Sequence, residues 1–260
     1  MLKKENLRIF IAGGKTLEFK EMHKFLIRQN YPFKEVDLYS PEFAETLSAL
    51  PDDVTIVLAG WDLSVRRNGV AKVGFGKNGL SIVLPRQTEV LNAAPRNCLY
   101  RQLLRFLMVA PTAYQKKIIA NAEGGIEGLY KLNLRKKEIE EIRNKEFRLL
   151  GLTKKDREKL DADFAKAEIK NGLYEIEVAK PAYFPFIFDE AFVRSFGRPR
   201  KLDIFVSFRD GSQSFYYGRS EIAFSLFDKF RGLYDGNNDW TGYKETVEEA
   251  RDYLHSLYSR

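Results

Sequence analysis

The chain has 260 residues, 44% of them hydrophobic and 13% aromatic, which is enough for one large domain or two smaller domains with real cores. This composition excludes a disordered protein. The single cysteine, Cys98, excludes an internal disulfide framework, and with only two histidines a Cys/His zinc site is excluded unless carboxylates supply most of its ligands. No apolar run approaches the roughly 18 residues of a membrane span, so we expect a cytoplasmic protein without membrane contact. No residue pattern names a metal or a cofactor.

Strand and helix patterns alternate over the first third of the chain. Apolar runs such as IFIA and VTIVLA fit strands that are buried on both faces, and Phe19, Met22 and Leu26 recur at helical spacing. Thr16 is suited to cap the first of these helices. The pattern predicts strands at residues 7–12, 33–39 and 54–59, with helices at 16–29 and 41–50 between them. Strands separated by helices favour a parallel sheet with right-handed crossovers.

The pattern changes after residue 59, because residues 60–79 are rich in glycine and have no helical period. Residues 70–83 indicate a hairpin or a mobile loop, since Asn78-Gly79 tolerates the positive φ of a tight turn. We expect a fourth strand at 80–84 and a helix at 95–109. Pro95 is tolerated in the first helical turn.

Residues 113–170 look helical, with interleaved charges of both signs that are typical of a mostly solvated helix. A domain boundary is expected near Gly151, where Thr153 could cap a further helix. Beyond it, Asp210-Gly211 lies between strands at 202–209 and 212–217 and predicts a hairpin with a type I′ turn. Two amphipathic helices follow, and Thr241 is the expected cap of the second one.

The expected fold class is therefore α/β. The chain is predicted to begin with a Rossmann-like domain with a mainly parallel sheet, residues 1–112, followed by a charged helical connector, residues 113–171. A smaller α+β domain, residues 172–260, completes it.

Two groups of residues are candidates for binding a ligand. Gly13, Gly14, Lys15 and Thr16 lie between a strand and a helix, where free backbone N–H groups and the helix dipole favour an anion. The turn lacks the glycine spacing of a P-loop and the third glycine of a dinucleotide fingerprint, so it equally fits a tight turn without a ligand. Trp61-Asp62 follows the strand at 54–59, at the edge where open parallel sheets place their ligands. The indole could stack on a base, or it could cover the core while Asp62 stabilises a turn.

The runs IFIAGG, VDLYSP and DVTIVLAGWD resemble, in this order, the nucleoside 2-deoxyribosyltransferase-like and TIR-like Rossmannoid domains. The resemblance covers residues 7–62. It implies a pocket for a nucleoside or NAD and chemistry at an N-glycosidic bond. These families use a catalytic glutamate in the segment after the third strand, but residues 65–79 contain none, and Glu89 is the only candidate nearby. The resemblance therefore supports a nucleotide-shaped pocket, and no residue is assigned as catalytic.

Residues 63–112 carry eight lysines and arginines against one acid, Glu89, which gives a net charge of +7 in this segment. Such a field favours a polyanionic partner, although a solvated surface or a seam facing an acidic subunit explains it equally well. Arg101 and Arg105 are one helical turn apart, and Lys72 and Lys77 flank Phe75, which could stack on a base. The residues predicted to contact nucleic acid are Arg66, Arg67, Lys72, Phe75, Lys77, Arg96, Arg101 and Arg105.

Other titratable residues give weaker signals. Glu175 and Glu177 lie on one face of a predicted strand, but no further residue completes a nuclease or metal site. Cys98 is expected to be an inert buried thiol, and His23 and His255 are expected to have structural roles.

The sequence thus predicts a binding protein that recognises nucleic acid or a phosphorylated nucleotide through a basic surface. One alternative is a nucleoside or NAD N-glycosidase or transferase that uses the pocket around Gly13, Lys15, Trp61 and Asp62. A second alternative is a structural subunit whose basic face docks an acidic protein partner.

Overall fold

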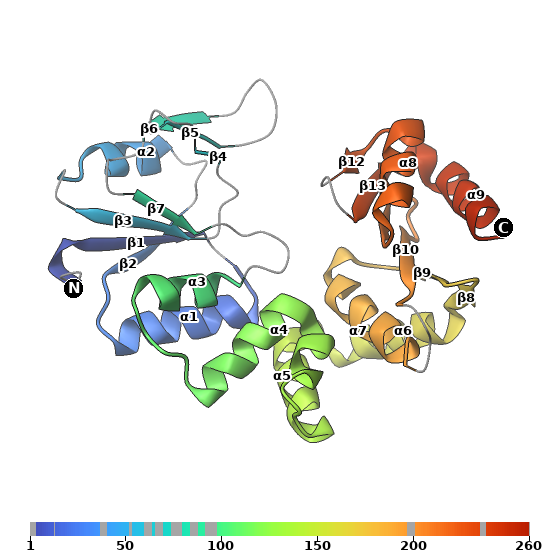
Figure 1. The fold of residues 1–260 in the computed structure, drawn as a ribbon, viewed down its shortest axis with the longest axis horizontal. Helices are drawn as coiled ribbons and strands as arrows, with labels where there is room; N and C mark the ends of the chain where they lie inside the picture. The colour runs from blue at the N-terminus through green and yellow to red at the C-terminus, as the bar shows by residue number, and fades with distance from the viewer. Residues whose placement is uncertain are drawn as a thin grey trace. The chain divides into compact units, whose positions relative to one another are not determined.

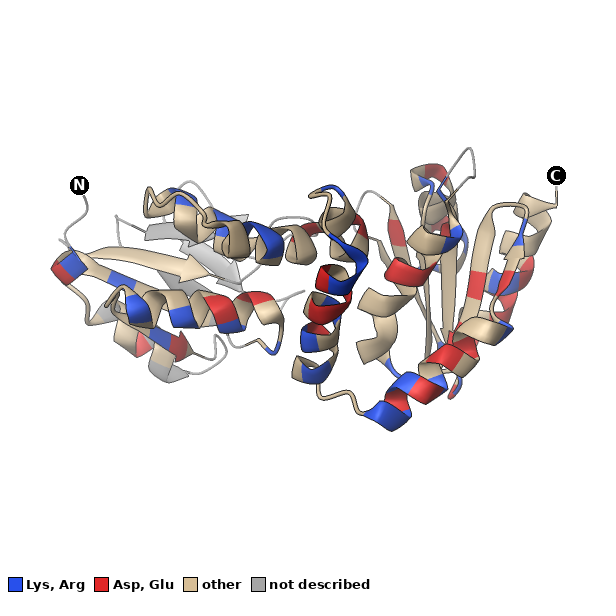
Figure 2. Cartoon of the chain, turned by 90° about the horizontal axis from the view of Figure 1, so that it is seen from below, with Lys and Arg blue, Asp and Glu red and all other residues tan. Residues whose placement is uncertain are grey.

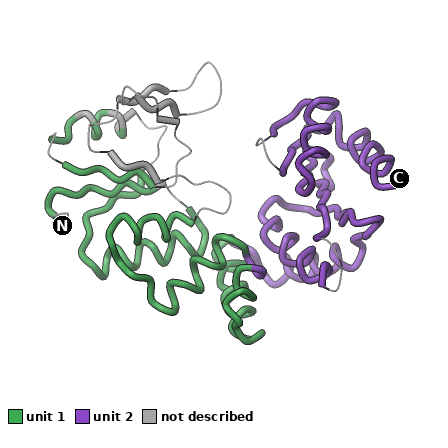
Figure 3. The backbone as a smooth tube through the Cα atoms, in the orientation of Figure 1, with its two compact units in different colours: residues 1–124, 128–150 green, residues 125–127, 151–260 purple. Residues whose placement is uncertain are grey.

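The computed structural model describes residues 4–12, 14–36, 41–51, 54–59, 64–65, 70–73, 80–83, 88–91, 98–196, 201–234 and 238–259. The chain divides into two compact units, shown in Figure 3. Unit 1 comprises residues 1–124 and 128–150, and unit 2 comprises residues 125–127 and 151–260. Among the described residues, no helix is both long enough and apolar enough to cross a membrane.

A parallel sheet forms the centre of unit 1. Its strands are β1 (Leu7–Ala12), β2 (Phe33–Val36), β3 (Thr55–Ala59) and β7 (Thr88–Leu91), and they lie in the order β2-β1-β3-β7. All three neighbouring pairs are parallel. In β1 the side chains of Leu7, Ile9, Phe10 and Ile11 are all buried, because helices cover both faces of the sheet. The predicted α/β class with a parallel sheet is confirmed.

Strands β4 (Ser64–Val65), β5 (Val70–Val73) and β6 (Leu80–Val83) form a separate antiparallel sheet in the order β4-β5-β6. The hairpin predicted over residues 70–83 is therefore confirmed. The strand predicted at 80–84 is β6, but it does not extend the parallel sheet. The fourth strand of the parallel sheet is instead β7, whose TEVL run is too short for its residue pattern to predict a strand.

The helices of unit 1 are α1 (Leu17–Arg28), α2 (Pro41–Ser48), α3 (Leu99–Phe106), α4 (Ala113–Tyr130) and α5 (Lys136–Leu149), and a 3-10 helix, Lys4–Asn6, precedes β1. Figure 1 shows α1 and α3 on one face of the parallel sheet and α2 on the other. Helix α4 is kinked at Gly125, where φ is 53°. Residues of α5 that were expected to be mostly solvated instead pack on α1, and Ile139, Ile142 and Phe147 are buried. Charges of both signs alternate along the helices of the chain in Figure 2, and two of the charged residues of α5, Arg143 and Glu146, are themselves buried.

Unit 2 is built on a mixed sheet whose described strands lie in the order β12-β13-β11-β10-β9-β8. The strands are β8 (Glu168–Lys170), β9 (Leu173–Val178), β10 (Asp203–Phe208), β11 (Gln213–Tyr217), β12 (Leu233–Tyr234) and β13 (Asp239–Tyr243). The helices are α6 (Lys154–Lys166), α7 (Phe184–Arg194), α8 (Ser220–Phe230) and α9 (Val247–Tyr258), with 3-10 turns at Pro181–Tyr183 and Lys244–Thr246. Strands β9 and β10 pair in parallel and are connected through α7, whereas the other pairs are antiparallel.

The two faces of this sheet are covered by different helices. Helices α8 and α9 pack on one face around Phe205, Tyr216 and Trp240, which are all fully buried. On the other face, aromatic side chains of α7 contact β10 and β11, as in the Phe184–Phe208 and Phe188–Tyr217 pairs. Alternate residues of β9 and β10 therefore belong to opposite layers of the core.

Two local predictions for unit 2 are corrected. The β10–β11 hairpin is confirmed, but of the two turn residues only Gly211 has a positive φ, 66°, so the turn is not type I′. The Asp210 carboxylate accepts a hydrogen bond from the Ser212 N–H and stabilises the turn instead. Thr241 does not cap the last helix, because it pairs with Phe215 inside the sheet; α9 begins after Thr246.

Candidate functional site

The carboxyl ends of β1 and β3 lie side by side in unit 1, because these strands pair in parallel with Ile11 opposite Ala59. The chain leaves β1 for β2 on one side and returns to β3 and then β7 on the other side. The strand order therefore reverses between β1 and β3. In open α/β sheets such a reversal opens a crevice at the carboxyl edge, and ligands bind there.

The predicted ligand-binding residues follow these two strands directly. Of them, Gly14, Lys15 and Thr16 are described, whereas Gly13, Trp61 and Asp62 lie outside the described residues. The side chain of Lys15 is exposed. Thr16 caps α1 as predicted, since its hydroxyl accepts a hydrogen bond from the Phe19 N–H at 3.4 Å. A Cβ atom at Gly14 would overlap the ring of Phe19, so packing alone favours glycine at this position.

A carboxylate of the chain itself occupies the first turn of α1. Oε2 of Glu146 accepts a hydrogen bond from the Leu17 N–H at 2.9 Å, and Asn121 Nδ2 lies 3.4 Å from the same oxygen. Asn121 in turn accepts a hydrogen bond of 2.8 Å from Arg143. Glu146 is 6% exposed, and burial raises the pKa of its carboxyl. One of the N–H groups expected to attract an external anion is therefore already bonded.

A second internal carboxylate bonds the start of α3. Glu18 Oε1 accepts hydrogen bonds from the Tyr100 N–H at 2.9 Å and from Cys98 Sγ at 3.0 Å. Cys98 is 3% exposed, and burial together with the charge of Glu18 raises the pKa of its thiol. A buried, protonated thiol is unreactive, as predicted for Cys98.

The structure describes only part of the predicted basic surface. Arg101 forms an ion pair of 2.7 Å with Glu123 of α4, whereas Arg105 is exposed and has no polar partner among the described residues. Lys72 lies in β5, with Ser64 and Ser81 as its register partners. The other predicted contacts lie outside the described residues and stay predictions: Arg66, Arg67, Phe75, Lys77 and Arg96.

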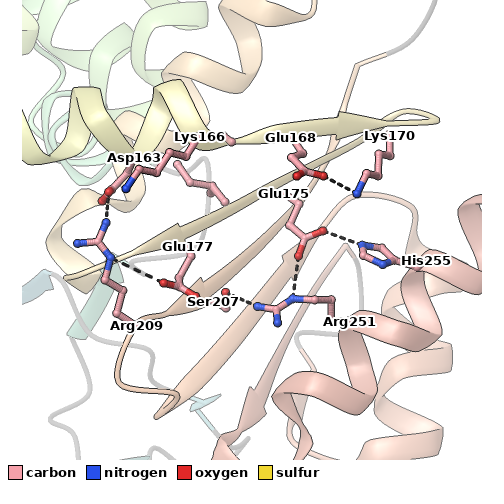
Figure 4. A pocket seen from close by; sticks show the side chains of 12 residues that line it. Asp163, Lys166, Glu168, Lys170, Glu175, Glu177, Ser207, Arg209, Arg251 and His255 are labelled. Atoms are coloured by element: carbon pink, nitrogen blue, oxygen red, sulfur yellow. Dashed lines mark hydrogen bonds and ion pairs between the residues drawn. The ribbon is translucent and has the colours of Figure 1, made fainter.

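Unit 2 contains a polar pocket of about 400 Å³ that the sequence did not predict as a site. We call it the mixed-charge pocket, because its described lining is dominated by charged side chains of both signs from α6, β8, β9, β10 and α9 (Figure 4). Glu175 and Glu177 project from β9 on the same face, as predicted, and Ser207 lies opposite Glu177 on β10.

Glu175 is held from both sides in this pocket. Its Oε1 lies 2.8 Å from Arg251 Nε, and its Oε2 lies 2.7 Å from His255 Nε2. Arg251 also bonds Glu248 at 2.5 Å and donates to the hydroxyl of Ser207 at 2.9 Å. Ion pairs and hydrogen bonds join these groups into a network, although Arg251 Nε is buried and has no hydrogen-bond partner among the described residues.

The opposite side of the pocket is less saturated. Arg209 binds the buried carboxylate of Asp163, which is 2% exposed, through a short hydrogen bond to Oδ1. The second oxygen of Asp163 is buried and has no hydrogen-bond partner among the residues that the structure describes. Glu177 is 56% exposed, and its ion pair with Arg209 is long, at 3.7 Å.

No protein-family model and no curated protein matches the chain.

The groups that sequence reasoning missed are far apart in the chain. Glu146 is 129 residues from Leu17, and His255 is 80 residues from Glu175. The only signal was the common face of Glu175 and Glu177, which indicated a polar surface on β9. Among the described residues, no group of His, Cys, Asp and Glu has the arrangement of a metal site.

Proposed function

We propose that this chain is a binding protein for a nucleotide phosphate, either a free phosphorylated nucleotide or a segment of nucleic acid. Its N-terminal part would be a Rossmann-like domain. The observation that carries the proposal is the reversal of strand order between β1 and β3. The two predicted ligand-binding segments, Gly13–Thr16 and Trp61-Asp62, follow the two strands that flank this reversal.

Glu146 limits where the phosphate of such a ligand can bind. Since its carboxylate already accepts the Leu17 N–H, an added phosphate at the first turn of α1 would meet a like charge at close range. We therefore assign phosphate contacts to the cations of residues 63–112, with Lys72, Lys77 and Arg105 as the first to test. The base would stack on Trp61.

Tryptophan fluorescence offers a direct test of the stacking contact. The chain has two tryptophans, and Trp240 is completely buried in unit 2, so a ligand-induced change in tryptophan emission would report Trp61. We expect quenching by a nucleotide in the wild type and its loss in Trp61→Phe. Quenching that persists in Trp61→Phe would contradict the assigned stacking.

Salt dependence tests the phosphate contacts. Binding of ATP, NAD and labelled single-stranded oligonucleotides should weaken between about 50 and 200 mM salt, and the triple charge reversal Lys72→Glu, Lys77→Glu, Arg105→Glu should flatten this dependence. Arg148→Glu is the matched control, because Arg148 is an exposed cation on α5 outside the basic segment. Binding that is indifferent to both salt and the triple reversal would remove the proposal.

The same experiments separate the two alternatives. Release of free base from NAD or a nucleoside would favour the N-glycosidase, particularly if Asp62→Asn abolished it. Absence of affinity for all three ligands, combined with co-purification of an acidic protein, would favour the structural subunit.

A further inference from the structure

The charges that line the mixed-charge pocket balance. Of its described lining side chains, four are carboxylates and four are lysines or arginines, so the formal charges of these eight groups cancel. A strongly charged ligand of either sign would meet as many like charges as opposite ones. The balance instead favours a ligand that is neutral overall and carries both signs.

Three exposed charged groups lie together on one side of the pocket, apart from the exposed Glu168–Lys170 ion pair. Figure 4 shows Lys166, Arg209 and Glu177 there, away from Glu175 and its partners. Lys166 is exposed and has no polar partner among the described residues, while Arg209 and Glu177 are 42% and 56% exposed. Two cations and one carboxylate are thus accessible within the same part of the wall.

Asp163 indicates that this side is held in a fixed geometry. Its buried carboxylate anchors Arg209 through one oxygen, and its second oxygen has no donor in the described structure. The second oxygen is closed to solvent and so does not contact the pocket, whereas the first oxygen fixes the position of Arg209 at the pocket wall.

The volume limits the size of the ligand. The volume of about 400 Å³ lies near the lower end of the roughly 300–1,000 Å³ typical of small-molecule sites. This suits a compact molecule, and the many charged side chains of the lining disfavour a large apolar one.

We propose that the mixed-charge pocket binds a small zwitterion of the free amino-acid type, whose carboxylate contacts Lys166 and Arg209 and whose ammonium group contacts Glu177. This site goes beyond the proposed nucleotide function, because it uses other residues, in the other unit, and a different ligand chemistry. Glu175, Arg251 and His255 form the opposite wall, where Arg251 and His255 both contact the carboxylate of Glu175.

The test is a titration of the full chain with the twenty L-amino acids and glycylglycine, each up to about 10 mM, followed by calorimetry. The tightest binder is then compared with its N-acetyl derivative, which lacks the cation, and its amide, which lacks the carboxylate. We expect saturable binding, and at least about a tenfold loss with each derivative, because each loses one charged hydrogen-bonding group.

Glu177→Gln and Lys166→Gln test the assigned contacts. Both side chains are exposed, so the fold should persist, and a thermal melt checks this. Each variant should weaken binding at least about tenfold. Glu158→Gln, an exposed change on the same helix as Lys166 but outside the pocket, should leave it within about twofold.

The following results would overturn the proposal. These are no saturable binding by any probe, equal binding of the parent and both derivatives, and undiminished binding by Glu177→Gln and Lys166→Gln. Inorganic phosphate that binds as tightly as the best amino acid would also overturn it, in favour of a simple anion site. Since nucleotide binding is measured separately, its failure leaves these outcomes unaffected.

Discussion

The carboxylate of Glu146 accepts the backbone N–H of Leu17 at 2.9 Å and so joins the last turn of α5 to the first turn of α1. The N-terminal N–H groups of a helix have no partner within the helix, and a carboxylate satisfies them both by hydrogen bonding and through the helix dipole. In this chain the partner comes from a distant helix. The contact fixes α5 against the layer that contains α1, close to the reversal of strand order where the ligand is expected.

The Glu146–Leu17 bond predicts a pH dependence of local stability. Burial raises the pKa of Glu146 above its ordinary value of 4.5, so the folded state binds this proton more tightly than the unfolded state does. The resulting stabilisation is full below pH 4.5 and is lost as the pH rises through the folded-state pKa. Glu146→Gln should remove this dependence, because a neutral amide can still accept the Leu17 N–H.

Amide hydrogen exchange of α1 measures this pH dependence within unit 1 itself. The protection of Leu17 should decrease from pH 4.5 to neutral pH in the wild type and should stay constant in Glu146→Gln. Glu141→Gln, an exposed change on the same helix, should behave as the wild type does. Equal pH profiles for wild type and Glu146→Gln would show that Glu146 does not titrate in this range.

Two glycines of α4 predict opposite effects of the same substitution. A Cβ atom at Gly128 would overlap the backbone carbonyl oxygen of Ala120, which cannot move without breaking the helix, whereas a Cβ atom at Gly124 meets nothing within 4 Å. Gly128→Ala should therefore lower the free energy of unfolding of unit 1 by more than about 1 kcal/mol, which is the amount by which a helix otherwise favours alanine over glycine. Gly124→Ala should be neutral or stabilising by up to about 1 kcal/mol. Urea denaturation of both variants checks the order, and a reversed order would contradict the packing at Gly128.

The sequence predicts those features that depend on neighbouring residues. The strand at 7–12 and the caps at Thr16 and Thr153 are confirmed because apolar runs and hydroxyl caps act over a few positions. The strand at 80–84 forms as β6 of the predicted hairpin, whereas no local pattern predicts β7, the short strand that completes the parallel sheet. Thr241 was assigned as a cap because its hydroxyl suits that role, yet the β11–β13 ladder includes it.

The candidate sites show the same limit more clearly. The common face of Glu175 and Glu177 follows from the two-residue repeat of a strand, which is local. The partners of these residues do not follow from any local pattern, since Arg251, His255 and Arg209 come from α9 and from the β10–β11 turn. Tertiary packing alone brings them together.

Two threonines precede helices of unit 2, but only Thr153 caps its helix through its side chain, which predicts different effects of the two substitutions. The Thr153 hydroxyl accepts a hydrogen bond from the Asp156 N–H, and the Asp156 carboxylate accepts one from the Thr153 N–H. Two backbone N–H groups that have no partner within the helix are thereby bonded. Thr153→Ala should lower the free energy of unfolding of unit 2 by about 1 kcal/mol. Thr246→Ala is the matched control, because the Thr246 hydroxyl donates to the Tyr243 carbonyl and does not cap α9. Thermal unfolding compares them, and equal losses would argue against the capping contribution.

The Arg101–Glu123 pair predicts that removing an acid strengthens polyanion binding. The two charges are 2.7 Å apart, so Arg101 is partly neutralised, whereas Arg105, one turn further along α3, is exposed and has no polar partner in the described structure. Arg105→Gln should therefore weaken oligonucleotide binding more than Arg101→Gln does.

Glu123→Gln should release Arg101 and raise the affinity for the oligonucleotide by about two- to fivefold at low salt. Screening reduces this gain as salt is added. Anisotropy titrations with a labelled oligonucleotide measure all three variants. If Glu123→Gln binds no better than the wild type while Arg105→Gln binds worse, α3 presents only Arg105 to the ligand, and Arg101 serves to hold α3 against α4.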